Sequence, residues 1–181
     1  MTRVMMHGCN GRMGQMITGL VAADDEIEIV AGVDVYDEGK NSYPVFDSID
    51  KCDIAVDAII DFASAKAVDG LLDYAVRTNT PVVVCTTGLS EDQLAHLKEA
   101  SGKVAVLRSA NMSLGINTLM KLLQDAVKVL APAGFDIEIV EKHHNQKLDA
   151  PSGTALALAD SINEAMDEAY SYTYDLYLIQ I

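Results

Sequence analysis

Three glycines near the N-terminus have a spacing that could bind a phosphate group. Gly8, Gly11 and Gly14 follow a short apolar run and open a segment with helical periodicity, in the order G-x-x-G-x-x-G. Glycine permits a tight turn and a close approach of backbone N–H groups, and the start of a helix adds the positive end of its dipole. The arrangement predicts a dinucleotide site, although the same glycines could form an ordinary turn. The candidate cofactor contacts in this loop are Gly8, Cys9, Asn10, Gly11, Arg12 and Met13.

An acidic residue follows the glycines at the distance that a dinucleotide site requires. Asp34 ends the second apolar run, about 20 residues beyond Gly14, where a carboxylate can accept hydrogen bonds from a ribose diol. The same negative charge repels a 2′-phosphate, so we expect NADH to be the preferred cofactor. Arg12 or Lys40 could still reach such a phosphate, and NADPH therefore stays possible.

Two later segments carry small hydroxyl and amide side chains directly after apolar runs. In an open α/β sheet these segments lie at the carboxyl ends of strands, where ligands bind. They could contact a ribose or an amide, although both compositions are also ordinary for loops. Cys85 is better explained as a small buried residue than as a nucleophile, because no activating base is near it in the sequence. The candidate cofactor contacts are Cys85, Thr86 and Thr87 in the first segment, and Ser109, Ala110, Asn111 and Met112 in the second.

The most polar stretch of the chain spans residues 141–154 and reads EKHHNQKLDAPSGT. Within five positions it holds two imidazoles and an ammonium group, at His143, His144 and Lys147. Such a set could bind a dicarboxylate and donate a proton, and a solvated loop is the alternative. A zinc site is disfavoured, because adjacent histidines of an extended segment point to opposite faces and no third ligand is near. The anion donors at the start of the next helical pattern are Ser152, Gly153 and Thr154.

A sheet and several helices are needed to bring these residues together. Short runs rich in Val, Ile and Ala predict buried strands. Apolar residues spaced i, i+3, i+4 and i+7 predict amphipathic helices between them. The alternation predicts an α/β fold with a Rossmann-type, doubly wound parallel sheet. The predicted strands are 3–7, 27–34, 54–61, 82–86 and 104–108, and the helical patterns are 13–21, 68–76 and 91–100.

The pattern changes near its middle, and this change predicts two domains. Residues 1–110 form the expected dinucleotide-binding domain, and residues 111–181 form an incomplete α+β domain for the substrate and for oligomerisation. In the second domain, apolar periodicity predicts helices over 116–130 and 155–166. Residues 135–140 alternate apolar and acidic side chains, which predicts a strand with one solvated face.

Composition narrows the possible functions and locations. The 181 residues include 27 acidic and 13 basic side chains, with a net charge of −14. Such a chain lacks the clustered Lys and Arg that nucleic acids and anionic membranes require. Its apolar runs are too short to span a bilayer, and the N-terminus does not have the pattern of a secretory signal. Three cysteines form neither a metal motif nor an even disulfide set, which favours a cytoplasmic location.

These motifs together resemble the dihydrodipicolinate reductase family, also named 4-hydroxy-tetrahydrodipicolinate reductase. The resemblance rests on the glycine loop, on IDF, CTTG and SANMS after successive predicted strands, and above all on EKHH and KLDAPSGTA in the polar stretch. It implies NAD(P)H-dependent reduction of a cyclic imine dicarboxylate, 4-hydroxy-tetrahydrodipicolinate, to tetrahydrodipicolinate in lysine and diaminopimelate biosynthesis. The resemblance implies that His143 is the acid/base residue, that Lys147 is the proton donor, and that the substrate contacts are His144, Ser152, Gly153 and Thr154.

The resemblance also bears on the C-terminal part of the chain. Family members continue with further strands that carry an Arg-Gly-Gly segment, whereas this chain departs from their pattern at about residue 168. We therefore expect a C-terminally truncated member, in which the family's homotetramer and turnover are in question. The first hypothesis is an active reductase. The alternative is a catalytically impaired module that binds NADH.

Overall fold

The computed structural model describes residues 1–37, 39–109, 111–143 and 151–174. The chain divides into two compact units, Met1–Ala110 and Asn111–Ile181. Within the described residues, every strand belongs to the first unit and the second unit is helical. The functions expected of the two parts, dinucleotide binding and substrate binding, stay predictions at this level.

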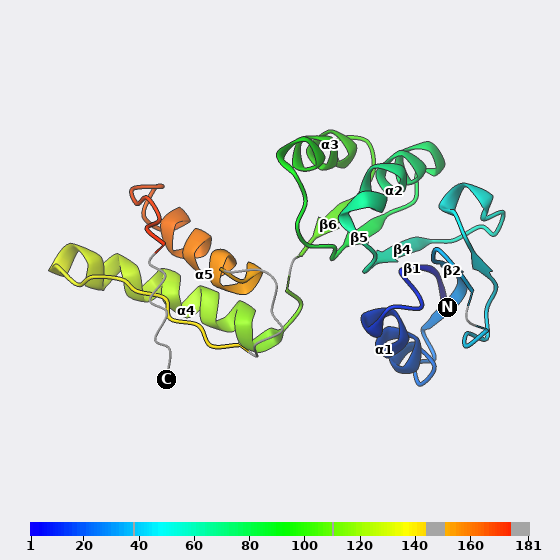
Figure 1. Cartoon of the computed structure of the whole chain (residues 1–181), viewed down its shortest axis with the longest axis horizontal. Coiled ribbons are helices and arrows are strands. Elements are labelled where there is room, and N and C mark those ends of the chain that lie inside the picture. Colours follow the sequence, from blue (N-terminus) through cyan, green and yellow to red (C-terminus); the bar gives the residue numbers. More distant parts are fainter. Residues whose placement is uncertain (38, 110, 144–150, 175–181) are drawn as a thin grey trace. The chain divides into compact units, whose positions relative to one another are not determined.

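The first unit contains one six-stranded sheet in which every pairing is parallel (Figure 1). The strand order β3-β2-β1-β4-β5-β6 starts in the middle of the sheet, builds to one edge and then builds to the other. This is the order of a doubly wound dinucleotide-binding sheet, and it confirms the predicted fold class. The strands are β1 (Thr2–His7), β2 (Ile27–Val33), β3 (Val45–Phe46), β4 (Ala58–Asp61), β5 (Val82–Val84) and β6 (Val106–Arg108).

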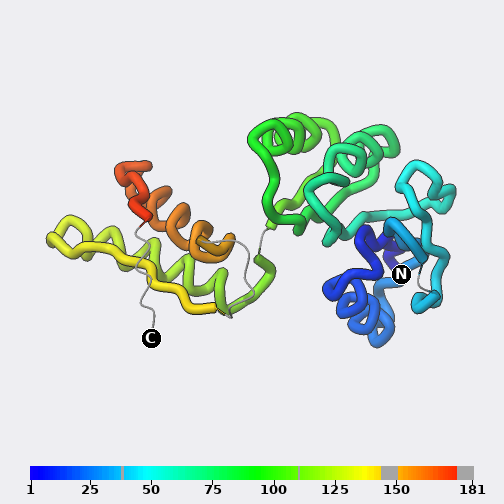
Figure 2. Tube along the Cα trace, viewed as in Figure 1, coloured from blue at the N-terminus to red at the C-terminus, as the bar shows by residue number. Residues whose placement is uncertain are grey.

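Helices cover both faces of the sheet, as the Cα trace also shows (Figure 2). Helix α1 (Arg12–Val21) lies on one face, and α2 (Ala65–Thr78) and α3 (Glu91–Ser101) lie on the other. Successive side chains of a strand point to opposite faces. Met5 of β1 accordingly belongs to the apolar cluster that includes residues of α2 and α3, whereas Met6 belongs to the cluster that packs against α1.

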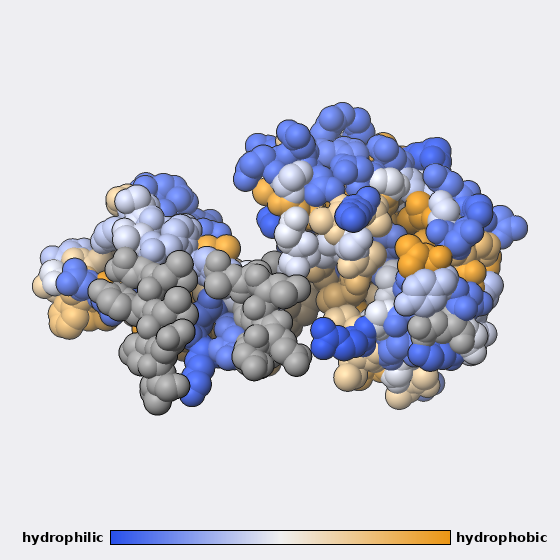
Figure 3. Space-filling model, in the orientation of Figure 1, coloured by the Kyte–Doolittle hydropathy of each residue, from blue (hydrophilic) through white to orange (hydrophobic). Residues whose placement is uncertain are grey.

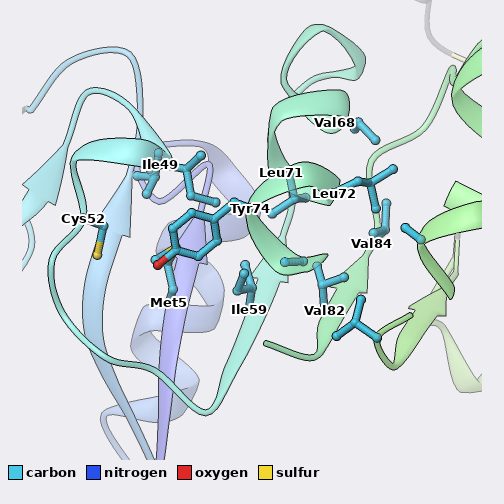
Figure 4. Packing of buried hydrophobic residues seen from close by; sticks show 14 of the residues in the cluster. Met5, Ile49, Cys52, Ile59, Val68, Leu71, Leu72, Tyr74, Val82 and Val84 are labelled. Carbon is cyan, nitrogen blue, oxygen red and sulfur yellow. The ribbon is translucent and has the colours of Figure 1, made fainter. Parts of the chain in front are cut away.

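The larger apolar cluster explains why α2 is held on the sheet. Leu71 and Leu72 of α2 are fully buried, as are Met5 and Ile59 of the strands beneath them. Figure 4 shows Tyr74 of the same helix among these side chains, beside the 3₁₀ turn that follows β3. Truncating a leucine in such a core costs about 2–5 kcal/mol of the free energy of unfolding. The carboxyl ends of the strands are therefore supported by a tightly packed interior.

The strands differ from the prediction chiefly at β4 and β3, while β5 ends two residues earlier and β6 begins two residues later than predicted. β4 begins at Ala58, whereas the prediction placed its start at Ile54. Ile54 and Val56 are apolar because they pack against the core, but they do not belong to the strand. β3 is only two residues long, and it pairs with the end of β2. So short a strand leaves no apolar run from which the sequence could predict it.

The second unit, in its described residues, is built on two helices in contact. These are α4 (Leu114–Leu130) and α5 (Gly153–Glu164), and a 3₁₀ turn at Ala131–Ala133 follows α4. Ser113 and Ser152 cap the two helices through their side-chain oxygens, which satisfies N–H groups that have no partner inside the helix. Both helices thus begin close to where periodicity predicts them.

The strand predicted over residues 135–140 is wrong. That segment has no strand assignment, and Figure 1 draws it as an extended trace without an arrow. Alternation of apolar and acidic residues shows which face of a strand would be wet, but a strand also needs a neighbour with which to pair its backbone. Among the described residues of this unit no such neighbouring strand is present.

The segment after α5 is tied back to that helix by side-chain hydrogen bonds, including one from the Tyr172 hydroxyl to Asp160 Oδ1 at 2.6 Å. The Asn163 amide donates from Nδ2 to the Tyr170 carbonyl at 3.0 Å and accepts at Oδ1 from the Tyr170 N–H at 2.9 Å. Asp167 and Glu168 have positive φ values of 55° and 58°, so the chain reverses here at residues that lack glycine's freedom. Across the described ranges, none of the helices has the length and apolar character needed to cross a membrane.

Candidate functional site

Residues 8–14, the glycine cradle, join β1 to α1 in a turn that larger residues could not form. Gly8 has a φ of 82° and its missing Cβ would lie 2.7 Å from the Phe62 carbonyl oxygen. A Cβ on Gly14 would lie 2.7 Å from the Cys9 carbonyl oxygen, so helix and turn are in direct backbone contact. Both glycines are required by this geometry. Gly8 and Gly14 are therefore packed into the turn, and its exposed part consists of Gly11, Arg12 and Met13.

The N-terminus of α1 is suited to an anion. Gly11 stands at the N-cap, makes no side-chain cap and is followed by a first turn with no acidic residue. The positive end of the helix dipole is thus left for another group. The first unit's α3 differs, because Ser90 and Gln93 form a capping box there and Glu91 and Asp92 occupy the first turn.

Cys9 does not present its side chain to the cradle's surface. The thiol is fully buried on the α1 side of the sheet, beside Gly32 and Tyr43. A Cβ on Gly32 would lie 2.7 Å from the Cys9 Sγ, so the thiol fills space that any side chain on Gly32 would need. Burial and the nearby Asp34 raise the pKa of the Cys9 thiol to about 11. Its backbone is engaged as well, because the Cys9 N–H donates to the Val33 carbonyl at 3.4 Å and its carbonyl accepts from Gln15 Nε2 at 2.9 Å.

Asp34 lies at the end of β2 and is half-buried beside the cradle. Its Oδ2 accepts a hydrogen bond from the Asn10 backbone N–H at 2.8 Å, and its Oδ1 accepts from the Val35 N–H at 2.8 Å. The Asn10 side chain extends the connection, donating to the Tyr36 carbonyl and accepting from Asn41. The predicted ribose carboxylate and the glycine turn are therefore fixed relative to one another.

The candidate residues after β5 fall into two groups by exposure. Cys85 and Thr86 are buried, whereas Thr87 is exposed. Burial, with Asp61 nearby, raises the pKa of the Cys85 thiol to about 11, which agrees with a packing role and not with a nucleophile. The Thr86 hydroxyl oxygen has no hydrogen-bond partner within the described part of the chain. Ser109 follows β6, and its N–H donates to the Val84 carbonyl at 3.0 Å.

One pair at this edge of the sheet is absent from the sequence prediction. His7 and Asp61 end β1 and β4, and His7 Nδ1 lies 2.8 Å from Asp61 Oδ1 with both residues buried. The two are 54 positions apart, so only the pairing of their strands brings them together. The IDF motif contains Asp61, and that motif was the one available signal.

In the second unit the structure brings several predicted residues to the start of α5. The Thr154 hydroxyl accepts from Asn111 Nδ2 at 3.3 Å, which joins a predicted substrate contact to a predicted cofactor contact. Ser152 is buried, and its hydroxyl accepts from the Ala155 N–H at 3.1 Å. That hydroxyl is thus used to cap the helix. Gly153 has open space where a side chain would stand, and Met112 is exposed.

Glu141 connects the candidate acid/base residue to this helix. One of its oxygens, Oε1, accepts from the Ser152 N–H at 2.8 Å, and the other, Oε2, lies 3.5 Å from His143 Nδ1. A carboxylate on one ring nitrogen orients an imidazole and leaves the opposite nitrogen available. Sequence reasoning assigned Glu141 no role. His144 and Lys147 lie outside the described residues, as does Ala110 of the cofactor set.

Within residues 1–37, 39–109, 111–143 and 151–174, no group of three or more His, Cys, Asp or Glu side chains is arranged to hold a metal ion. A dinucleotide site in the first unit and a substrate site in the second stay predictions at this point.

Comparisons with known proteins find family matches for both units of the chain. Residues 2–112 match the family model described as dihydrodipicolinate reductase, N-terminus, and residues 115–176 match the one described as dihydrodipicolinate reductase, C-terminus. The second match runs past residue 168, where the sequence is expected to depart from the family pattern.

Individual relatives give the same result. The 4-hydroxy-tetrahydrodipicolinate reductase of Caldanaerobacter subterraneus subsp. tengcongensis is 48% identical over 98% of this chain, and that of Clostridium novyi is 46% identical over 93%. The chain spans 69% and 66% of these two relatives, or about two-thirds of their length. A dipicolinate-bound dihydrodipicolinate reductase from Paenisporosarcina sp. TG-14 has a TM-score of 0.73 at 29% identity, with 99% of this chain and 72% of that one covered. The chain therefore belongs to the dihydrodipicolinate reductase family.

Proposed function

We propose that this chain reduces 4-hydroxy-tetrahydrodipicolinate to tetrahydrodipicolinate with a reduced nicotinamide nucleotide, preferably NADH. The family uses NAD(P)H, and the nucleotide supplies the hydride when bound. The observation that carries the proposal is the tight glycine cradle, which leads directly into the uncapped N-terminus of α1 and has Asp34 beside it.

The residues of the first unit fit a dinucleotide. Any Cβ at Gly8 or Gly14 would collide with neighbouring backbone, so the cradle stays narrow and lets N–H groups approach a pyrophosphate. Asp34 keeps acceptor capacity beyond its two backbone bonds, since an ionised carboxylate has about four lone-pair sites. A ribose diol could use that capacity, whereas a 2′-phosphate would meet its negative charge. This contrast supports the preference for NADH.

The second unit supplies groups for a diacid substrate. A relative of known structure is described as bound to dipicolinate, a planar ring with two carboxylates. We infer that the start of α5 binds one carboxylate here, through the N–H groups of Gly153 and Thr154 and the Thr154 hydroxyl. His143, oriented by Glu141, would transfer a proton as charge develops on the ring, and Lys147 is the further donor that the family pattern implies.

The test is substrate-dependent NADH oxidation by the purified 181-residue chain. We expect turnover, and we expect His143→Ala to lower kcat about 100-fold or more through lost acid catalysis. His96→Ala is the matched control, because it removes a histidine from the outer helices of the first unit and should leave turnover unchanged. Unaltered kcat in His143→Ala would remove the role assigned to that residue. NADH binding without turnover would favour the binding-module alternative.

A further inference from the structure

The proposed reaction makes no direct use of the buried pair formed by His7 and Asp61. Removing two ionisable side chains from water carries a penalty that apolar residues of similar volume avoid. Asp61 has no exposed surface, and its second oxygen, Oδ2, has no hydrogen-bond partner within the described ranges. The pair lies at the carboxyl edge of the sheet, where the proposed nucleotide site is. Its energetic cost is explained if the pair holds a part of that site in place.

Asp61 holds two neighbours with one oxygen. Its Oδ1 lies 2.8 Å from His7 Nδ1, which donates to it when protonated, and it also accepts from the Ala63 N–H at 3.1 Å. The backbone adds a second tie, because the Phe62 N–H donates to the His7 carbonyl at 3.0 Å. The end of β1 and the turn at residues 62–63 are thus joined both by side chains and by main chain.

The glycine cradle rests on that same turn. The missing Cβ of Gly8 would lie 2.7 Å from the Phe62 carbonyl oxygen and 2.8 Å from the Ala63 Cα. Gly8 is the residue directly after His7, and its own N–H donates to the Val33 carbonyl at 2.8 Å. Any displacement of the 62–63 turn would therefore be passed to the first residue of the cradle.

We propose that His7 is a positioning residue for the dinucleotide site. Acting through Asp61 and the 62–63 turn, it holds Gly8 in the conformation from which the cradle's N–H groups reach the pyrophosphate. The inference rests on the proposed dinucleotide function and adds a residue to it that does not touch the nucleotide. Donor geometry at Nδ1 is the property that matters, and the imidazole's outer nitrogen is not needed.

Three variants separate donor geometry from simple packing. In His7→Asn the amide nitrogen stands two bonds from Cβ, as Nδ1 does, whereas in His7→Gln it stands three bonds away. His7→Leu keeps bulk and has no donor. By NADH fluorescence titration we expect the Kd to rise about tenfold in His7→Leu, as for loss of a hydrogen bond to a charged group, and to stay within about threefold in His7→Asn. His96→Leu removes a different His–Asp pair of the same unit and should leave the Kd unchanged.

Each possible result supports or overturns the positioning role of His7. If the unaltered chain does not bind NADH, the proposed function fails and this inference with it. If the unaltered chain binds NADH and folded His7→Leu binds it equally well, this inference alone fails. Should His7→Leu not fold, His7→Gln gives the comparison, and a Kd equal to that of the unaltered chain overturns the inference. Loss of folding in both variants assigns the pair to stability and overturns it as well.

Discussion

At the scale of single residues, the site depends on charges and backbone contacts that are set by a few side chains. Asp34 illustrates this, because its two oxygens accept hydrogen bonds from the cradle at Asn10 and from the start of the next loop at Val35. The buried cysteines behave differently. Burial raises the pKa of the Cys9, Cys52 and Cys85 thiols, so their role is to fill space.

Asp34→Asn should move cofactor preference toward NADPH. The substitution removes the negative charge beside the 2′ position while keeping an oxygen that can accept from the Asn10 N–H. We expect the ratio of the NADPH and NADH affinities to change about tenfold in favour of NADPH. Fluorescence titration with each nucleotide measures this ratio. Asp37→Asn is the control, since Asp37 is exposed and accepts from the Gly39 N–H. An unchanged ratio in Asp34→Asn would remove the electrostatic basis for preferring NADH.

At the scale of elements, buried strands and amphipathic helices are the ones that the sequence predicts best. Runs such as 82–86 contribute Val82 and Val84 to the core beneath α2 and α3, and their apolar character makes them recognisable without a structure. The wrong strand at 135–140 shows the limit, because alternation carries no information about a pairing partner. The pair His7 and Asp61 shows the same limit in the site, since residues 54 positions apart meet only through strand order. The cradle, in contrast, is contiguous in sequence and was predictable.

Helix α1 contains two glycines with opposite expected responses to alanine. Gly14→Ala places a methyl group 2.7 Å from the Cys9 backbone, and we expect a loss of about 1–3 kcal/mol in the free energy of unfolding together with weaker NADH binding. Gly19→Ala meets nothing within 4 Å, and we expect a gain of about 0.5–1 kcal/mol from helix propensity. Urea unfolding of both variants gives the comparison. Equal effects at the two positions would contradict the proposed backbone contact.

Helices α2 and α3 are linked by a pH-sensitive contact on their hydrophilic outer surface (Figure 3). His96 Nδ1 lies 2.8 Å from Asp69 Oδ1, and its Nε2 lies 3.3 Å from Asp73 Oδ1. Hydrogen bonding to Asp69 raises the pKa of His96 above its ordinary value and lowers that of Asp69.

The link should therefore stabilise the fold only in an intermediate pH range. The histidine's contribution is complete below its unfolded pKa and is lost as pH rises through its raised folded pKa. The aspartate's contribution is lost as pH falls through its lowered folded pKa. Between pH 5 and 6, we expect His96→Ala to lower Tm by about 1–2 °C, and we expect this difference to shrink by pH 9. A difference that grows with pH would contradict the ion pair.

At the scale of the whole molecule, the proposed function assigns the nucleotide to one unit and the diacid to the other. Hydride transfer brings a nicotinamide ring and a diacid ring together, so binding of one ligand should favour binding of the other. The chain spans about two-thirds of the length of the two relatives named above.

Pyridine-2,6-dicarboxylate should tighten NADH binding. This planar diacid resembles the proposed substrate, and we expect it to lower the Kd for NADH about fivefold or more. His143→Ala should bind NADH alone normally but lose much of this coupling. Pyridine-2-carboxylate, with one carboxylate, is the ligand control and should have a smaller effect. Identical NADH titrations with and without the diacid would show that this chain does not couple its two expected sites.

The contact between Cys9 and Gly32 has an evolutionary consequence. Cys9 occupies the position where the common dinucleotide fingerprint has a glycine, and its bulk is accommodated because the neighbouring strand has no side chain at position 32, beside Tyr43. A Cβ at position 32 would also lie 2.7 Å from Tyr43 Cε2, so a larger residue there becomes acceptable only where the side chains at positions 9 and 43 both leave room for it. Related sequences should therefore show compensatory exchange between these positions, which would preserve the interior volume under the cradle while its residues change.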